Sequence, residues 1–243
     1  MADSANESFF QRHHFFLRRL HSLTGIIPIG VFLCVHLTIN STIIHGAAAF
    51  QTAVEGIHLL DRVGMLGVVE FVFIFLPLLF HGVLGVQIWL TGKFNVTTHQ
   101  YGGNVRYTLQ RITGLIAFAF ILYHLWHMHW LGQPLGGGLF QPHNAAASAA
   151  NALGPWYLRG IYAIGLLAAV FHFANGIWTF LITWGIVIGP QAQRKVGWVC
   201  AAIGVLLALA GLGSLRGFGQ MVAQPQQPEG PTAEMVAQVD HAP

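Results

Sequence analysis

The sequence predicts an all-α membrane protein built from five transmembrane helices. Only 8% of its 243 residues are charged, against about 25% in typical soluble domains, and its mean hydropathy is +0.60. Five apolar runs reach the length of about 20 residues that a helix needs to cross a bilayer. These runs lack the polar stripe at helical period that a water-soluble bundle would carry, so a soluble core is disfavoured.

The five spans are expected at residues 22–45, 65–91, 108–131, 157–188 and 196–215. A short surface helix is expected at 144–151, within a connection that is rich in Gly, Pro and Ala. The chain divides into an N-terminal segment 1–14, a transmembrane domain 15–217 and a Pro-rich segment 218–243. We expect this last segment to be a disordered tail outside the membrane. No signal peptide is predicted, because the first apolar run is a full span.

The basic residues predict the orientation in the membrane. If the spans alternate in direction, eight of the eleven lysines and arginines fall on one side and three on the other. Because cytoplasmic loops carry the excess of positive charge, the N-terminus is expected in the cytoplasm and the C-terminus outside. The net charge of +3 mostly reflects this bias and indicates no nucleic-acid partner. The eight are Arg12, Arg18, Arg19, Lys93, Arg106, Arg111, Arg194 and Lys195, and the three are Arg62, Arg159 and Arg216.

Four histidines lie inside the apolar runs and form two matched pairs. Phe80-His81, with a glycine four residues after the histidine, recurs as Phe171-His172. The motif LHSLTG at 20–25, with His36 downstream, recurs as LQRITG at 109–114, with His124 downstream. Ionisable residues inside a span are energetically unfavourable and usually functional. A haem b that only transfers electrons needs two axial imidazoles, one on each face. The sequence therefore predicts two haems b, each bound between two helices.

The depth of each histidine in its span suggests the pairing. His36 and His124 each lie fourteen residues after a polar residue at the expected cytoplasmic boundary, which places both about 21 Å from it. They are expected to share an outer haem. His81 and His172 are then expected to share an inner one, and the glycines that follow them to leave room for the macrocycle. His127, one turn after His124, is the rival ligand or a quinone contact, and His129 is expected to be solvated.

Other residues have narrower expected roles. His21, Ser22, Gln110, Arg111 and Arg194 cluster near the expected inner edge, where the anionic haem propionates need donors. The alternative for the arginines is binding of lipid headgroups. The two cysteines, Cys34 and Cys200, are isolated within apolar runs and are expected to be packing residues, with neither covalent haem attachment nor an iron–sulfur cluster.

These motifs, in this order and spacing, resemble the dihaem cytochrome b subunit of bacterial succinate:quinone oxidoreductases, which include fumarate reductases. The resemblance covers roughly residues 9–215. It implies five spans, ligation of two haems b by His36, His81, His124 and His172, and propionate donors at His21, Ser22, Gln110, Arg111 and Arg194. The segments that carry it are RLHSLTG at 19–25, LCVHL at 33–37, FLP at 75–77, LQRITG at 109–114, FHFANGIW at 171–178 and TWG at 183–185.

The resemblance also implies a location in the inner membrane of a bacterium, partners and a reaction. An iron–sulfur subunit and a flavoprotein subunit would supply electrons from succinate on the cytoplasmic side, and menaquinone or ubiquinone would accept them near the outer haem. Fumarate reduction would use the same parts in reverse. Glu55 is expected to exchange protons with the quinone, with Asp61 and Glu70 as rivals. The alternatives are a cytochrome b of a hydrogenase or another quinone-linked dehydrogenase, and a transporter that uses its histidines as a proton relay.

Overall fold

The structure is a computed structural model that describes residues 12–93, 96–98 and 101–223. The regular elements in these residues are all helical. The α-helices are α2 (His14–Ile26), α3 (Pro28–Ser41), α4 (Ala47–His58), α5 (Leu66–Val69), α6 (Leu76–Thr91), α7 (Gly102–Met128), α8 (Ala145–Ala152), α9 (Trp156–Thr183) and α10 (Pro190–Ala223). Short 3₁₀ turns at Thr42–His45, Leu59–Val63, Trp130–Leu135 and Pro142–Asn144, and a π-helical segment at Glu70–Phe75, connect them.

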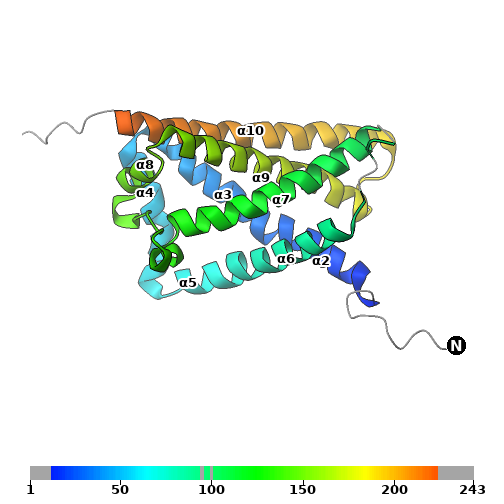
Figure 1. Ribbon diagram of the computed structural model, residues 1–243, viewed down its shortest axis with the longest axis horizontal. Helices are drawn as coiled ribbons and strands as arrows, with labels where there is room; N and C mark the ends of the chain where they lie inside the picture. Colours follow the sequence, from blue (N-terminus) through cyan, green and yellow to red (C-terminus); the bar gives the residue numbers. More distant parts are fainter. Residues whose placement is uncertain (1–11, 94–95, 99–100, 224–243) are drawn as a thin grey trace, which may run out of the picture.

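Five segments long and apolar enough to cross a membrane lie side by side in one bundle (Figure 1). The predicted all-α membrane protein with five spans is therefore confirmed. The first and third spans begin earlier than expected, because the helices continue through Arg18 and Arg106. Arginine tolerates this position, since its aliphatic stem lies along an apolar surface while its charge reaches water. The spans are His14–His45, Leu66–Thr91, Gly102–Met128, Trp156–Thr183 and Pro190–Val222.

Two local irregularities shape the first two spans. Helix α2 ends at Ile26 and α3 begins at Pro28. The helix is interrupted here because proline has no N–H to continue the backbone hydrogen bonds. In the second span, the π-helical segment Glu70–Phe75 precedes α6. Its wider turns change the direction in which the following side chains point. Both irregularities lie in segments that carry histidines of interest.

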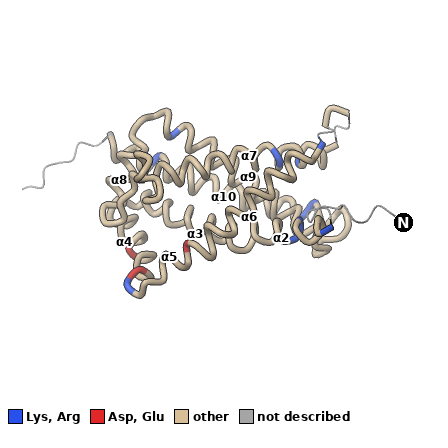
Figure 2. The backbone as a smooth tube through the Cα atoms, turned by 60° about the horizontal axis from the view of Figure 1, so that its bottom comes forward, with Lys and Arg blue, Asp and Glu red and all other residues tan. Residues whose placement is uncertain are grey.

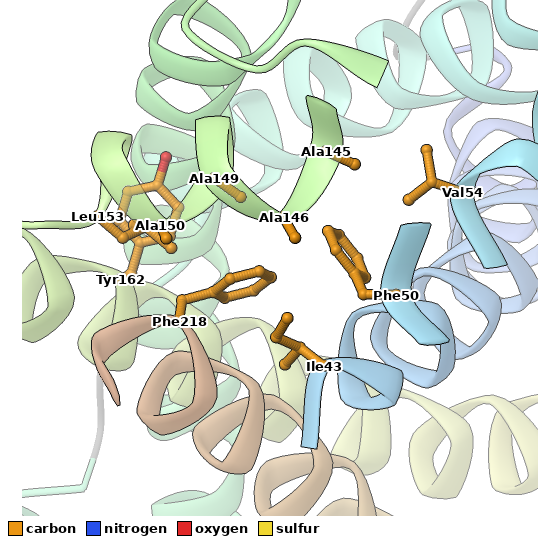
Figure 3. Packing of buried hydrophobic residues seen from close by; sticks show 10 residues of the cluster. All are labelled: Ile43, Phe50, Val54, Ala145, Ala146, Ala149, Ala150, Leu153, Tyr162 and Phe218. Carbon is orange, nitrogen blue, oxygen red and sulfur yellow. The ribbon is translucent and has the colours of Figure 1, made fainter. Parts of the chain in front are cut away.

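Helices α4 and α8 form a compact cap at one end of the bundle (Figure 1), and Figure 3 shows the packing of its buried side chains. Phe50 of α4, Phe218 of α10 and the alanines of α8 pack together there, and Phe50 and Phe218 are each only 2% exposed. A short helix was expected at 144–151, but its location on the surface was wrong: six of its eight residues are buried. Small alanine side chains let α8 pack closely between its neighbours.

The tail was predicted to begin at residue 218, but Phe218 is buried in the cap. Helix α10 continues to Ala223, so residues 218–223 belong to the bundle and not to a disordered segment. Phe218 continues the apolar face of α10, which explains why the helix extends past the expected boundary. The rest of the predicted tail, residues 224–243, lies outside the described residues.

Charges divide between the two ends of the bundle (Figure 2). The described acidic residues, Glu55, Asp61 and Glu70, all lie at the end that carries α4 and α5. Basic residues are concentrated at the opposite end, near the start of α2 and of α7, although a few also lie at the acidic end. This asymmetry agrees with the distribution from which the orientation was predicted.

Candidate functional site

His81 of α6 and His172 of α9 face one another inside the bundle. Their ring centroids are 6.1 Å apart and their planes are nearly perpendicular, at 86°. The two histidines that share a Phe-His motif are thus brought together from different helices. His81 lies beside the C-terminal half of α2, and His172 beside the N-terminal half of α7.

The same kind of hydrogen bond, from Nδ1 to a backbone carbonyl, holds each of these imidazoles. His81 Nδ1 lies 2.9 Å from the carbonyl oxygen of His21, and His172 Nδ1 lies 3.0 Å from that of Gln110. A carbonyl oxygen only accepts hydrogen bonds, so Nδ1 must carry the proton in both rings. The other ring nitrogen, Nε2, is then deprotonated and able to bind a metal.

The glycine of each Thr-Gly motif makes room for this contact. A Cβ atom at Gly25 would collide with the His81 ring. One at Gly114 would lie 2.7 Å from Cε1 of His172, closer than real Cβ contacts allow. The repeat noted in the sequence is therefore a structural repeat: a carbonyl and a glycine one turn later form a seat for a histidine from the facing helix.

The glycines that follow the two histidines face side chains of neighbouring helices. Gly85 faces the side chain of His21 on α2, and Gly176 faces that of Gln110 on α7. His21 also stacks on His81, with ring centroids 3.9 Å apart and planes 14° from parallel.

A second pair lies nearer the cap. His36 of α3 and His124 of α7 have ring centroids 5.8 Å apart and planes 77° apart. Among the described side chains, Nδ1 of His124 is buried and makes no hydrogen bond. The rival residue, His127, is 5% exposed and its Nδ1 lies 2.7 Å from the hydroxyl of Tyr162, a contact that leaves its Nε2 able to bind a metal as well.

Both pairs have the spacing of two ligands on one metal ion. Metal–imidazole bonds are about 2.0–2.1 Å long, so two ring centroids on opposite sides of one ion lie about 6 Å apart. The observed values are 6.1 Å and 5.8 Å. In each pair, one histidine comes from the first two spans and the other from the third or fourth.

Comparison with known proteins identifies the family of the chain. No family model matches the chain. However, it is 38% identical over 204 residues to the succinate dehydrogenase cytochrome b558 subunit of Bacillus subtilis (strain 168), covering 84% of this chain and 96% of that protein. The chain belongs to this family of succinate dehydrogenase cytochrome b subunits. The predicted resemblance to succinate dehydrogenase cytochrome b subunits is thereby confirmed, while the number of haems stays a prediction, and the chain is a multi-pass membrane protein.

The predicted propionate donors of this cytochrome b subunit do not form a single cluster of free groups. Ser22 donates to the carbonyl of Arg19 and accepts a hydrogen bond from Trp184. Buried Arg111 donates to the carbonyls of Trp89 and Gly92, which joins α7 to the end of α6. Arg194 is exposed on α10. His21 and Gln110 lie beside the His81–His172 pair.

The three acidic candidates of the cytochrome b subunit have different surroundings. Glu55 is exposed on α4 and accepts a hydrogen bond of 3.0 Å from Gln51. Asp61 is exposed and lies 3.7 Å from His58. Glu70 is more enclosed: its carboxylate lies 3.9 Å from Nε2 of His129, which is only 20% exposed and therefore less solvated than expected.

Sequence reasoning gave no role to two polar residues beside the histidines. Asn175 is 3% exposed and hydrogen-bonds both Gln110 and Arg106. Tyr162 is 6% exposed and binds His127. The available signal was a polar group inside an apolar span, and in the case of Asn175 its position three residues after His172, on the same helix face.

Proposed function

We propose that this chain is the membrane anchor and electron-transfer subunit of a succinate dehydrogenase, with two haems b. His81 and His172 would bind the inner haem, and His36 and His124 the outer one. The observation that carries this proposal is the presence of two histidine pairs, each at the spacing of axial ligands and each drawn from different spans. A haem b with two imidazole ligands supplies one-electron transfer without binding oxygen.

Hydrogen bonds within the protein hold the inner histidines ready to bind haem. The backbone carbonyls of His21 and Gln110 fix the tautomer and the orientation of His81 and His172. Such outer hydrogen bonds also raise the basicity of a ligand. Neutral imidazoles avoid the energetic penalty of a buried charge. His21, Ser22, Gln110, Arg111 and Arg194 remain the proposed donors to the propionates, with His21 and Gln110 best placed.

The two ends of the bundle would serve different partners. The basic end, with the start of α2 and of α7, would face the cytoplasm of a bacterium and bind the iron–sulfur subunit, which in turn binds the flavoprotein subunit. The cap end would react with menaquinone or ubiquinone. Electrons from succinate would cross the bundle from the first end to the second, and fumarate reduction would use the same residues in reverse.

A carboxylate at the cap end would exchange protons with the quinone. Glu55 is the residue proposed from the sequence, and its exposure on α4 gives it access to water. A specific observation favours Glu70 as a second candidate. Its partner His129 follows directly after α7, which carries His124, so this pair is tied to the outer histidine site, whereas Glu55 contacts Gln51.

The test is a haem count combined with a redox titration of the purified complex. Two haems per chain are expected by the pyridine haemochrome method. Substitution of His36 or His124 is expected to remove one titrating component, and substitution of His81 or His172 the other. A haem-free preparation from a haem-replete host would refute the proposal. Loss of the same component in His36→Ala and His172→Ala would refute the pairing.

A further inference from the structure

Arg106, Asn175 and Gln110 form a continuous hydrogen-bonded chain that ends at His172. The Arg106 guanidinium donates to the Asn175 side-chain oxygen at 2.9 Å. The Asn175 amide nitrogen donates to the Gln110 side-chain oxygen at 2.7 Å, and the Gln110 amide nitrogen donates to the His172 carbonyl at 3.0 Å. The His172 imidazole then donates back to the Gln110 carbonyl.

The chemistry at its two ends fixes the direction of this chain. Arginine only donates hydrogen bonds and a backbone carbonyl only accepts them, so both amides between them can take a single orientation. The two amide dipoles therefore align, with the positive charge of Arg106 at one end and the residue that carries the imidazole at the other. Arg106 is itself held in place by the ring of Trp178, 3.8 Å from the guanidinium carbon.

The first half of the protein holds its histidine in the same way without such a series of hydrogen bonds. His21 occupies the place of Gln110 in the repeat, and His81 that of His172. At the positions equivalent to Arg106 and Asn175 the first half has Leu17 and Leu84, which cannot form these bonds. His81 nevertheless makes the same hydrogen bond to a carbonyl. A buried amide and a charge were thus added to one seat only, although burying polar groups is unfavourable unless they are paired.

We propose that Arg106, Asn175 and Gln110 are positioning residues that orient His172 and raise the reduction potential of the inner haem. The inference rests on the proposed function. A fixed positive charge favours the reduced state, in which the iron carries one positive charge fewer. At roughly 12 Å and an effective dielectric constant of about 20, one charge changes the reduction equilibrium on the order of tenfold. For one electron, a tenfold change corresponds to 59 mV.

The test is a redox titration of the intact complex in which the inner haem is identified as the component lost in His172→Ala. Arg106→Gln is expected to make reduction of that component about tenfold less favourable, a shift of about 59 mV to lower potential. Arg106→Lys keeps the charge and a donor and is expected to restore most of the shift. Lys195→Gln removes another charge from the same end of the bundle and serves as the matched control.

A second variant separates the hydrogen-bonded chain from the charge alone. Asn175→Leu introduces the residue type found at the equivalent position in the first half and removes both hydrogen bonds of Asn175 without changing the charge. We expect a smaller decrease in potential than in Arg106→Gln and a changed low-spin ferric EPR signal, which depends on the angle between the imidazole planes. Unchanged potentials in both Arg106→Gln and Asn175→Leu, or an equal shift in Lys195→Gln, would overturn this inference while leaving the two-haem proposal intact. A wild-type complex without haem would instead refute the proposed function.

Discussion

Replacement of Gly114 by alanine tests whether the glycine seat holds a ligand. The added Cβ would lie 2.7 Å from Cε1 and 2.9 Å from Nδ1 of His172. Ordinary carbon contacts are about 3.5–4.0 Å, so the ring must move by about 1 Å away from α7. That movement weakens the hydrogen bond to the Gln110 carbonyl, which now measures 3.0 Å.

The energetic consequence follows from two terms. A buried polar group left without its partner costs about 1–3 kcal/mol, and an imidazole forced off its preferred rotamer costs about 0.5–1.5 kcal/mol more. Together they weaken the inner haem site by roughly 2–4 kcal/mol. Since every 1.4 kcal/mol is tenfold, haem affinity is expected to fall by about 30- to 1000-fold.

The assay is the transfer of haem from the purified complex to an excess of apomyoglobin, followed spectroscopically. The matched control is Gly160→Ala, also on the α7 and α9 pair of helices but with no neighbour within 4 Å of the added Cβ. Gly114→Ala is expected to lose one haem much faster than the wild type, and Gly160→Ala to lose it at the wild-type rate. Equal retention in both variants would show that His172 is not held as we describe.

Three further predictions concern the rest of the molecule. His36→Ala and His124→Ala are each expected to abolish the same titrating component; if His124→Ala leaves both components in place, His127 is the ligand. Gln51→Ala removes hydrogen bonds that join α4 to Pro142 and Ala145. It is expected to lower the free energy of unfolding by about 1–3 kcal/mol and to speed proteolysis of the connection 132–144, whereas Thr52→Ala, on the exposed face of α4, is expected to change neither. Glu70→Gln and Glu55→Gln are each expected to lower quinone-linked succinate oxidation while dye-linked oxidation stays normal, and the larger loss identifies the proton-exchanging acid.

The fold could be predicted largely because a bilayer restricts the choices. Long apolar runs in a membrane must be helices whose backbone bonds are satisfied internally. The errors arose where tertiary packing decided the outcome. Phe218 is followed by a Pro-rich sequence typical of a tail, yet α10 continues because Phe218 packs against Phe50, 168 positions earlier in the chain. Residues 145–152 are mostly alanine, and their burial depends entirely on what surrounds them.

The part of the candidate site that is formed by repeated sequence motifs could be predicted. The doubled motifs identified four histidines and suggested their pairing, and the structure brings the partners of each pair together. The hydrogen bonds to the carbonyls of His21 and Gln110 were not predicted. Every residue has a backbone carbonyl, so the type of residue does not indicate which carbonyl accepts a hydrogen bond. The hydrogen bonds of Asn175 were missed because its partners, Arg106 and Gln110, lie on α7, more than 60 residues earlier in the sequence.

The distribution of the paired histidines over the spans has a consequence for biogenesis. The inner pair joins α6 to α9, and the outer pair joins α3 to α7. The outer site is complete only once the third span has been inserted, and the inner site only once the fourth has. Insertion of the inner haem must therefore come late, into a bundle whose helices are already neighbours. Once bound, each haem would act as a strut between the early and the late half of the chain. We accordingly expect haem-starved cells to accumulate a loosened, protease-sensitive form of the subunit, because a ligand that binds only the assembled state stabilises it by mass action.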